Sequence, residues 1–207
     1  MKKSLLTKSV ITAGIFGLSI AASTANASFG DCKFYAGAGL DYSKHSLDKS
    51  EAYDSNVKIK NKGLGLLIPI VGLKFHDNFA VEAGYSFNKK ISFKQVGDPN
   101  VSYKVSNAYL DVVGLMPTVD KLDLLGGLGV GRLMVRKGEN TPSNWKVKNK
   151  FGWRVKLGAQ YNFTSNVAVR ALATYQSVKN KVQEENGSTE KFVKNMKSIG
   201  LSAIYSF

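Results

Sequence analysis

An alternation of apolar and polar residues with a period of two restricts the folds that this chain can adopt. It is clearest at the end of the chain, where every second position is apolar: Ile199, Leu201, Ala203, Tyr205 and Phe207. Successive side chains of a β-strand point to opposite faces of a sheet, so this period predicts a strand with one apolar face. The segment alone fits both the closing strand of a membrane barrel and an amphipathic strand of a soluble sheet.

Eight segments of this kind follow one another along the chain. We expect strands at residues 33–42, 63–75, 79–87, 101–116, 121–135, 151–161, 167–176 and 198–207. The connections alternate between short turns (76–78, 117–120, 163–166) and longer polar loops (43–62, 88–100, 136–148, 179–194). Transmembrane strands need about 9–11 residues, so this pattern predicts an up-and-down barrel. The register of the second strand stays open, because Pro69 lacks a backbone donor.

The start of the sequence predicts export from the cytoplasm. Three lysines precede an apolar run over residues 10–22, and Ala25-Asn26-Ala27 follows it. This order is typical of a secretory signal peptide, which we place at residues 1–27. The run is shorter than the roughly 20 residues that a membrane-spanning helix needs. We therefore expect residues 28–207 to form one secreted domain that does not meet nucleic acid.

The orientation of the two strand faces depends on the charged residues. Seven of them share the polar phase of the predicted strands: Asp41, Glu82, Asp111, Asp123, Arg154, Lys156 and Arg170. In a soluble lipocalin-like barrel these side chains would form the solvated outside. Glycines and alanines share the same phase, which favours the inside, because an eight-stranded barrel is only wide enough for its own side chains. We therefore predict that the charges face the lumen and the apolar phase faces lipid.

Aromatic residues gather at both ends of the predicted strands. Near the short turns these are Phe34, Phe75, Phe79, Tyr161, Tyr205 and Phe207, and near the loops they are Tyr42, Phe87, Phe151 and Tyr175. Aromatic girdles of this kind mark the two interfaces of a membrane. The predicted fold is all-β: an eight-stranded antiparallel up-and-down transmembrane β-barrel with four longer outward loops and three short periplasmic turns.

Charges inside so narrow a barrel must be paired. Removing one partner of a buried ion pair costs about 3–5 kcal/mol, because the other charge is left without compensation. We therefore expect the seven inward charges to form an ion-pair network that closes the lumen, with Arg154 and Arg170 as its hubs. A small porin with an open lumen is the alternative.

Several stretches carry a family resemblance. They are the Asn78–Tyr85 segment, the glycine-rich Gly126–Gly131 segment and the aromatic C-terminus. With these the chain resembles the small outer-membrane barrels that include OmpA-type, OmpX-type and opacity-protein-type surface proteins. The resemblance implies a place in the bacterial outer membrane and a role in adhesion, complement or host-matrix binding, or envelope integrity. It also implies that the barrel-assembly machinery reads the last strand, which ends in Phe207.

The loop ends of the predicted barrel are basic. Residues 44–62, 89–104, 132–150 and 179–197 together contain 20 lysines and arginines but only 8 acidic residues. We expect an adhesive surface for anionic host partners, either sulfated glycans or acidic protein patches, centred on Arg136, Lys137, Trp145, Lys146 and Lys148. The alternative is that basic residues at the strand tops, such as Lys89, Lys90, Lys148 and Lys150, neutralise lipopolysaccharide phosphates.

Catalytic and metal-binding patterns are sparse. The chain has two histidines, His45 and His76, which the barrel would hold at opposite ends. A metal site needs several ligands together, and nothing supplies them. Some outer-membrane barrels modify lipids, and His45 with Ser43 and Ser46 is the only serine-histidine candidate. We predict no enzyme, no catalytic residue and no cofactor.

Overall fold

A computed structural model of the chain describes residues 32–47, 58–94, 101–137, 146–149, 151–183 and 189–207. These residues form ten β-strands: β1 (Lys33–Leu47), β2 (Lys58–Lys60), β3 (Lys62–His76), β4 (Phe79–Lys94), β5 (Val101–Val119), β6 (Leu122–Lys137), β7 (Lys146–Lys148), β8 (Phe151–Asn162), β9 (Val167–Gln183) and β10 (Thr189–Ser206). No helix in the described part of the chain is long and apolar enough to cross a membrane.

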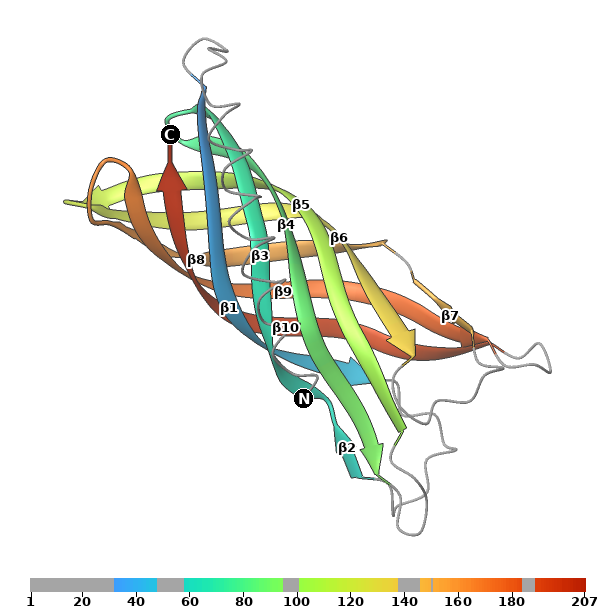
Figure 1. The fold of residues 1–207 in the computed structure, drawn as a ribbon. Coiled ribbons are helices and arrows are strands. Elements are labelled where there is room, and N and C mark those ends of the chain that lie inside the picture. Colours follow the sequence, from blue (N-terminus) through green and yellow to red (C-terminus); the bar gives the residue numbers. More distant parts are fainter. Residues whose placement is uncertain (1–31, 48–57, 95–100, 138–145, 150, 184–188) are drawn as a thin grey trace.

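Eight long strands form one closed barrel. Their order is β10-β1-β3-β4-β5-β6-β8-β9, every neighbouring pair is antiparallel, and pairing of β9 with β10 closes the sheet. The short strands β2 and β7 pair with β4 and β9. Figure 1 shows the short turns and the C-terminus at one end, the short-turn end, and β2 and β7 at the other, the loop end. The predicted antiparallel eight-stranded barrel is confirmed.

Several strands extend further toward the loop end than predicted. β1 continues to Leu47 and β10 begins at Thr189, so the expected first and fourth loops are shorter. Ser43 pairs with Ser198 and Lys44 with Lys197 in this extension. The apolar alternation stops there because the outward side chains are polar, whereas the backbone pairing continues.

The second long strand contains a bulge at Pro69. The register of β3 shifts against β4 between Leu67 and Ile70, and against β1 between Gly37 and Gly39. Proline donates no ladder hydrogen bond, so within sheets it is found at edges and bulges. The bulge lets both Leu67 and Ile70 pack in the lumen core, although their spacing is three. This explains why the segment is apolar in both phases of the sequence.

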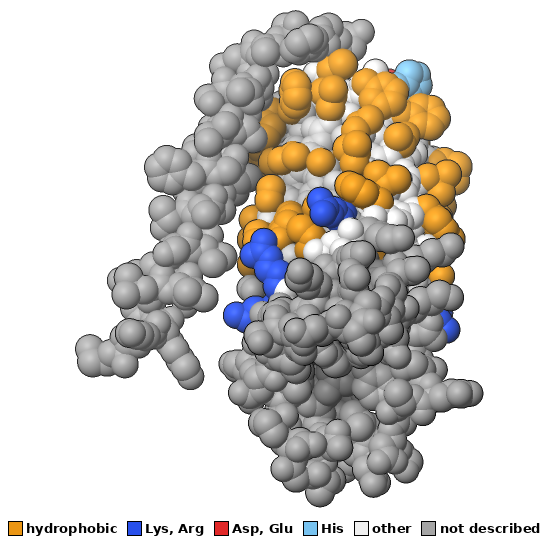
Figure 2. All heavy atoms as spheres, turned by 90° about the vertical axis from the view of Figure 1, so that its right-hand side faces the viewer, with side chains coloured by type: hydrophobic (Ala, Val, Ile, Leu, Met, Phe, Trp, Pro, Cys, Tyr) orange, Lys and Arg blue, Asp and Glu red, His pale blue; other side chains and the backbone are white. Residues whose placement is uncertain are grey.

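The outer wall of the barrel carries an apolar belt. Its most exposed aliphatic side chains include Leu64, Leu110, Val112, Leu128, Leu157, Ile199 and Leu201. Aromatic pairs lie at the short-turn end (Phe75–Phe79, Tyr161–Phe163, Tyr205–Phe207) and further toward the loop end (Tyr85–Phe87, Trp153–Tyr175). Figure 2 shows hydrophobic side chains over the described wall, and the lysine and arginine side chains visible there lie toward the loop end. The apolar phase therefore faces outward, as predicted.

Candidate functional site

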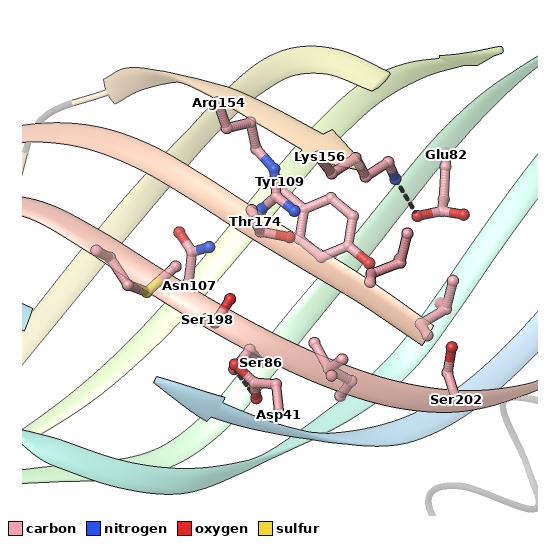
Figure 3. A pocket seen from close by; sticks show the side chains of 15 residues that line it. Asp41, Glu82, Ser86, Asn107, Tyr109, Arg154, Lys156, Thr174, Ser198 and Ser202 are labelled. Carbon is pink, nitrogen blue, oxygen red and sulfur yellow. Dashed lines mark hydrogen bonds and ion pairs between the residues drawn. The ribbon is translucent and has the colours of Figure 1, made fainter. Parts of the chain in front are cut away.

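Five charged side chains meet inside the lumen. The Lys156 ammonium lies 2.5 Å from Glu82 Oε1 and 3.0 Å from Asp111 Oδ2. Arg154 Nε lies 3.0 Å from Asp111 Oδ1, and Arg170 pairs with Glu82 Oε2. All five residues are buried. They form a continuous chain of ion pairs in the order Arg170, Glu82, Lys156, Asp111 and Arg154, part of which Figure 3 shows.

Strand register explains why the lysine lies at the centre of this chain. Glu82 on β4 stands directly opposite Asp111 on β5, an arrangement of like charges that is unfavourable without a cation between them. Lys156 reaches both carboxylates from β8. Two glycines of β6 leave the space: an added Cβ would lie 2.9 Å from the Lys156 side chain at Gly127 and 2.2 Å from an Asp111 oxygen at Gly129. Gly127 and Gly129 therefore leave room for the ion pairs, which agrees with the prediction that glycines share the lumen face.

Neutral side chains add hydrogen bonds at the Glu82–Arg170 end of the charged chain. The Tyr35 hydroxyl donates to Glu82 Oε2 over 3.0 Å. Gln160 Oε1 accepts hydrogen bonds from two nitrogens of Arg170, at 3.1 and 2.9 Å. Sequence reasoning did not single out these two partners, although Tyr35 and Gln160 both stand in the polar phase. Their place in that phase, beside charged neighbours, is the signal that identifies them.

An aromatic ring supports the other end of the chain. The guanidinium carbon of Arg154 lies 3.9 Å from the centroid of the Tyr109 ring, which Figure 3 shows beneath it. An arginine at this distance from an aromatic face is attracted by the ring quadrupole. Arg154 therefore lies between a carboxylate and an aromatic ring.

The other two of the seven predicted lumen charges, Asp41 and Asp123, accept hydrogen bonds from neutral side chains. Asp41 accepts a hydrogen bond from the Ser86 hydroxyl over 3.2 Å. Asp123 accepts one from the Asn162 amide over 2.8 Å, near the short-turn end. Both side chains are on the predicted face.

The predicted hubs of the network are wrong. Arg154 and Arg170 each pair with one carboxylate and lie at the two ends of the chain. Glu82 instead has three partners, and Lys156 bridges two acids. The period of two gives the face of each strand that points inward, but the partner across the lumen depends on the stagger of the strands.

Other side chains fill the lumen on both sides of the charged chain. On the short-turn side lies a cluster of Tyr35, Ile70, Ala80, Val113, Leu115, Leu125, Ala168 and Ile204. On the loop side, buried residues include Tyr103, Val105, Asn107, Leu133, Val135, Gln176, Val178 and Met196. The cavity left beside the charged chain measures about 30 Å³, which is room for roughly one or two water molecules. A wider cavity of about 290 Å³ lies at the short-turn end.

The predicted binding surface of the third loop lies mostly in strands. Arg136 and Lys137 end β6, and the Arg136 side chain is exposed. Lys146 and Lys148 belong to β7, so the expected loop is shorter than predicted. Trp145 lies outside the described residues. Of the strand-top lysines in the alternative hypothesis, Lys89 and Lys90 belong to β4, whereas Lys150 is not described.

The histidines do not gather with other metal ligands. His45 lies in β1 rather than in a loop, is buried, and has its Nδ1 atom 3.3 Å from the carbonyl oxygen of Asn61. Ser43 is also buried in this strand. His76 is exposed at the end of β3. Within the described residues, no group of three or more histidine, cysteine or acidic side chains could hold a metal ion.

Comparison with known proteins identifies the family of this barrel. Residues 10–207 match the outer membrane protein beta-barrel domain. Among solved structures, OprG from Pseudomonas aeruginosa has a TM-score of 0.59 at 17% identity, covering 84% of this chain and 95% of that one. AlkL in lipid bilayers has a TM-score of 0.57 at 17% identity, covering 88% of this chain and 93% of that one. Ail of Yersinia pestis, in complex with the heparin analogue sucrose octasulfate, has a TM-score of 0.51 at 14% identity, covering 86% of this chain and 100% of that one.

These likenesses to solved structures, all at low identity, show the fold. No protein with a curated description matches the sequence. The family match covers nearly the whole chain, and the fold and the outward apolar belt agree with it. The chain therefore belongs to the outer membrane protein β-barrel domain family and is a β-barrel of the bacterial outer membrane.

Proposed function

We propose that this protein is a surface barrel that binds anionic partners through its basic loop end, and that its lumen is closed. The observation that carries the proposal is the distribution of exposed charge. At the loop end, all exposed charged side chains of the described residues are basic: Lys44, Lys62, Lys104, Arg132, Arg136, Lys194 and Lys197. The exposed acids of the described part, Asp77 and Asp120, lie at the short-turn end.

Strand pairing concentrates this charge around Arg136. Lys104 on β5 stands directly opposite Arg136 on β6. Like charges that face each other across a strand pair are unfavourable for folding, so stability does not explain the arrangement. Arg132 is also exposed on β6, with its guanidinium 5.6 Å from the Phe151 ring centroid. Arginine and aromatic side chains tend to dominate the energy of interfaces, which supports this edge as the centre of binding.

The class of ligand follows from the charge. We call Lys104, Arg132 and Arg136 the basic edge. A polysulfated or otherwise acidic partner would neutralise it, and complementary charge steers such a partner toward it. Ail, a barrel of the same fold, forms a complex with sucrose octasulfate, which supports a polyanion as the ligand class. The ion pairs and apolar layers in the lumen support closure rather than transport. We propose no catalytic activity for the barrel.

A binding screen tests the proposal. The refolded barrel is exposed to heparin-like glycans and serum proteins, and the screen is repeated after Arg136, Lys137, Lys146 and Lys148 are changed to glutamine. Binding by the parent should weaken with added salt, because exposed charges are screened beyond roughly 8 Å at physiological ionic strength. The neutralised variant should bind more weakly than the parent at every salt concentration.

The matched control removes exposed lysines from the short-turn end with Lys33→Gln and Lys121→Gln, and it should bind like the parent. Equal binding by parent and neutralised variant, or no binding by either, contradicts the adhesive role and leaves lipopolysaccharide neutralisation at the strand tops. A steady, large single-channel conductance of the parent in planar bilayers contradicts the closed lumen and favours a small porin.

The C-terminal strand is proposed to have a separate role during biogenesis. The last strand, β10, closes the barrel against β1, and the Phe207 amide that follows it donates to the Phe34 carbonyl over 2.9 Å. We propose that the barrel-assembly machinery recognises this strand. Truncation of Phe207 should then lower the amount of barrel inserted in the membrane, measured against a Phe163→Ala control.

A further inference from the structure

The outer wall of the barrel contains a groove of about 510 Å³ at its loop end, between β8, β9, β10 and β1. This volume is within the ~300–1,000 Å³ range of small-molecule sites. Strand register explains the hollow. Ala173 on β9 pairs with Leu157 on one side and with Ile199 on the other, so a methyl group lies between two large side chains. Tyr175 closes the groove at the next outward position of β9.

A row of three lysines crosses the top of this groove. Lys44 on β1 stands directly opposite Lys197 on β10 and, on its other side, opposite Lys62 on β3. All three side chains are exposed, and Lys44 and Lys197 line the groove. Neighbouring strands are about 4.8 Å apart, so the row spans roughly 10 Å between its outer Cα atoms.

The row lies at the border of the apolar belt. The next outward positions toward the short-turn end are Tyr42, Ile199 and Leu64, which pair with one another across the same three strands and are exposed. Three cations therefore stand immediately above a surface that faces lipid. This is the height at which the headgroups of membrane lipids lie.

The three lysines have no acidic partner in the described part of the chain. None of the ion pairs of the lumen involves Lys44, Lys62 or Lys197. Like charges directly opposite each other on neighbouring strands are unfavourable. An anion placed over the row removes this repulsion, and the groove below it offers apolar surface to whatever carries the anion.

We propose that the groove and the lysine row bind one phosphorylated, net anionic lipid of the outer leaflet. Its phosphate contacts Lys44 and Lys197, with Lys62 extending the cationic surface, and one acyl chain lies over Ala173 between Leu157 and Ile199. A basic side chain near an anionic membrane surface adds about a fivefold preference, so two lysines give about a twenty- to thirtyfold preference over a zwitterionic lipid.

This lipid site is separate from the basic edge around Arg136. The lysine row crosses β10, β1 and β3, whereas Lys104 and Arg136 lie on β5 and β6, with β4 between the two groups. A soluble polyanion has charge but no acyl chain, so the apolar groove would not contribute to its binding. The two sites can therefore be tested independently.

Trp153 provides an optical probe of the groove. Its ring lies 5.3 Å from the ring of Tyr175, which lines the groove. The chain has two tryptophans, so Trp145→Phe leaves Trp153 as the only tryptophan. The full barrel in zwitterionic micelles is titrated with small mole fractions of phosphatidylglycerol or phosphatidylcholine that carry the same brominated acyl chains. Phosphatidylglycerol should quench Trp153 at about twenty- to thirtyfold lower mole fraction.

Matched variants distinguish the site from general charge attraction. Lys44→Gln with Lys197→Gln should abolish the headgroup preference, and Ala173→Leu should reduce quenching by filling the groove. Lys104→Gln, an exposed lysine on another strand, and Ala203→Leu, an exposed alanine on β10, should behave like the parent.

Three results would overturn the headgroup preference at the lysine row. They are equal quenching of the parent by both lipids, an unchanged preference in the double lysine variant, and an equal loss of preference in Lys104→Gln. Displacement of the bound phosphatidylglycerol by sucrose octasulfate would assign the lysine row to soluble polyanions instead. A loss of quenching in Ala203→Leu as large as that in Ala173→Leu would also overturn the placement of the acyl chain.

Discussion

The lumen and the loop end of this barrel use the same basic residue types in opposite ways. In the lumen, Lys156 is 1% exposed and bridges two carboxylates. At the loop end, Lys44 is exposed and stands between two other lysines. A buried charge without a partner is strongly destabilising, whereas an exposed one is solvated and screened by salt. Charges in the lumen must therefore be paired, whereas exposed charges at the loop end can remain available to an external anionic partner.

The comparison implies that substitutions in the two regions change different properties. In the lumen they should change the free energy of unfolding and leave the loop-end surface as it is. At the loop end they should change binding and leave stability nearly constant, since exposed substitutions away from special features usually stay within about 0.5 kcal/mol.

Glu82→Gln should have the largest effect. It removes the carboxylate that pairs with Lys156 and Arg170, so Arg170 loses its only described acidic partner. We expect the free energy of unfolding to fall by about 3–5 kcal/mol, measured by urea titration in lipid vesicles. Asp77→Asn, at an exposed position in a short turn, is the matched control and should change it by less than about 0.5 kcal/mol. Equal stability of the two variants would show that the lumen charges are hydrated.

A double-mutant cycle sharpens this result. Arg170→Met in the Glu82→Gln background removes the cation that the first substitution leaves unpaired. The two changes should therefore couple by about 0.5–3 kcal/mol, with the double variant more stable than the sum of the single effects predicts. Arg154 pairs with Asp111 rather than with Glu82 and lies at the other end of the same chain, so Arg154→Met should couple to Glu82→Gln more weakly than Arg170→Met does. Additivity for the Arg170 pair would contradict the described contact.

Gly129→Ala should destabilise the barrel by overpacking. A Cβ at this position would lie 2.2 Å from both an Asp111 carboxylate oxygen and the Leu110 carbonyl oxygen, and the carbonyl belongs to the backbone. We expect a loss of about 1–3 kcal/mol in the same urea titration. Gly126→Ala is the control on the same strand, because its nearest atom is a flexible Leu157 methyl group at 3.7 Å. It should change stability little, and equal losses in both variants would point to backbone conformation rather than to space.

The sequence predicts the inward face of every lumen charge but not the contacts between them. The period of two places Glu82, Asp111 and Lys156 on one face because alternation is a local property of each strand. Which carboxylate a cation reaches depends on the stagger of strands far apart in the chain, and no local pattern encodes it. The same limit applies to the outer groove, since Ala173 becomes its floor only through pairing with two other strands.

Two local features also escaped prediction for physical reasons. The loop-end extension of β1 through Lys44 and His45 has polar residues on its outer face, so hydrophobic alternation ends before the hydrogen-bonded ladder does. At Pro69 a bulge changes which alternate positions of β3 point into the lumen. In the sequence this segment is therefore an apolar run without alternation. Both features change where side chains point without changing the number of strands.

The smallest expected change in stability concerns the lysine row. Replacing a charged residue there should raise stability, whereas in the lumen it should lower it. Lys197→Glu replaces one of three facing cations with an anion directly opposite Lys44. Cross-strand pairs of this kind contribute about 0.2–1 kcal/mol, so in zwitterionic micelles the variant should be more stable than the parent by about that amount. Added salt should reduce the gain, because the charges are exposed. In vesicles that contain phosphatidylglycerol the order should reverse, since the parent then gains a lipid that the variant repels. A variant less stable than the parent in both environments would mean that Lys197 has a structural role, and that the contrast between paired charges in the lumen and facing lysines in the row does not hold at this position.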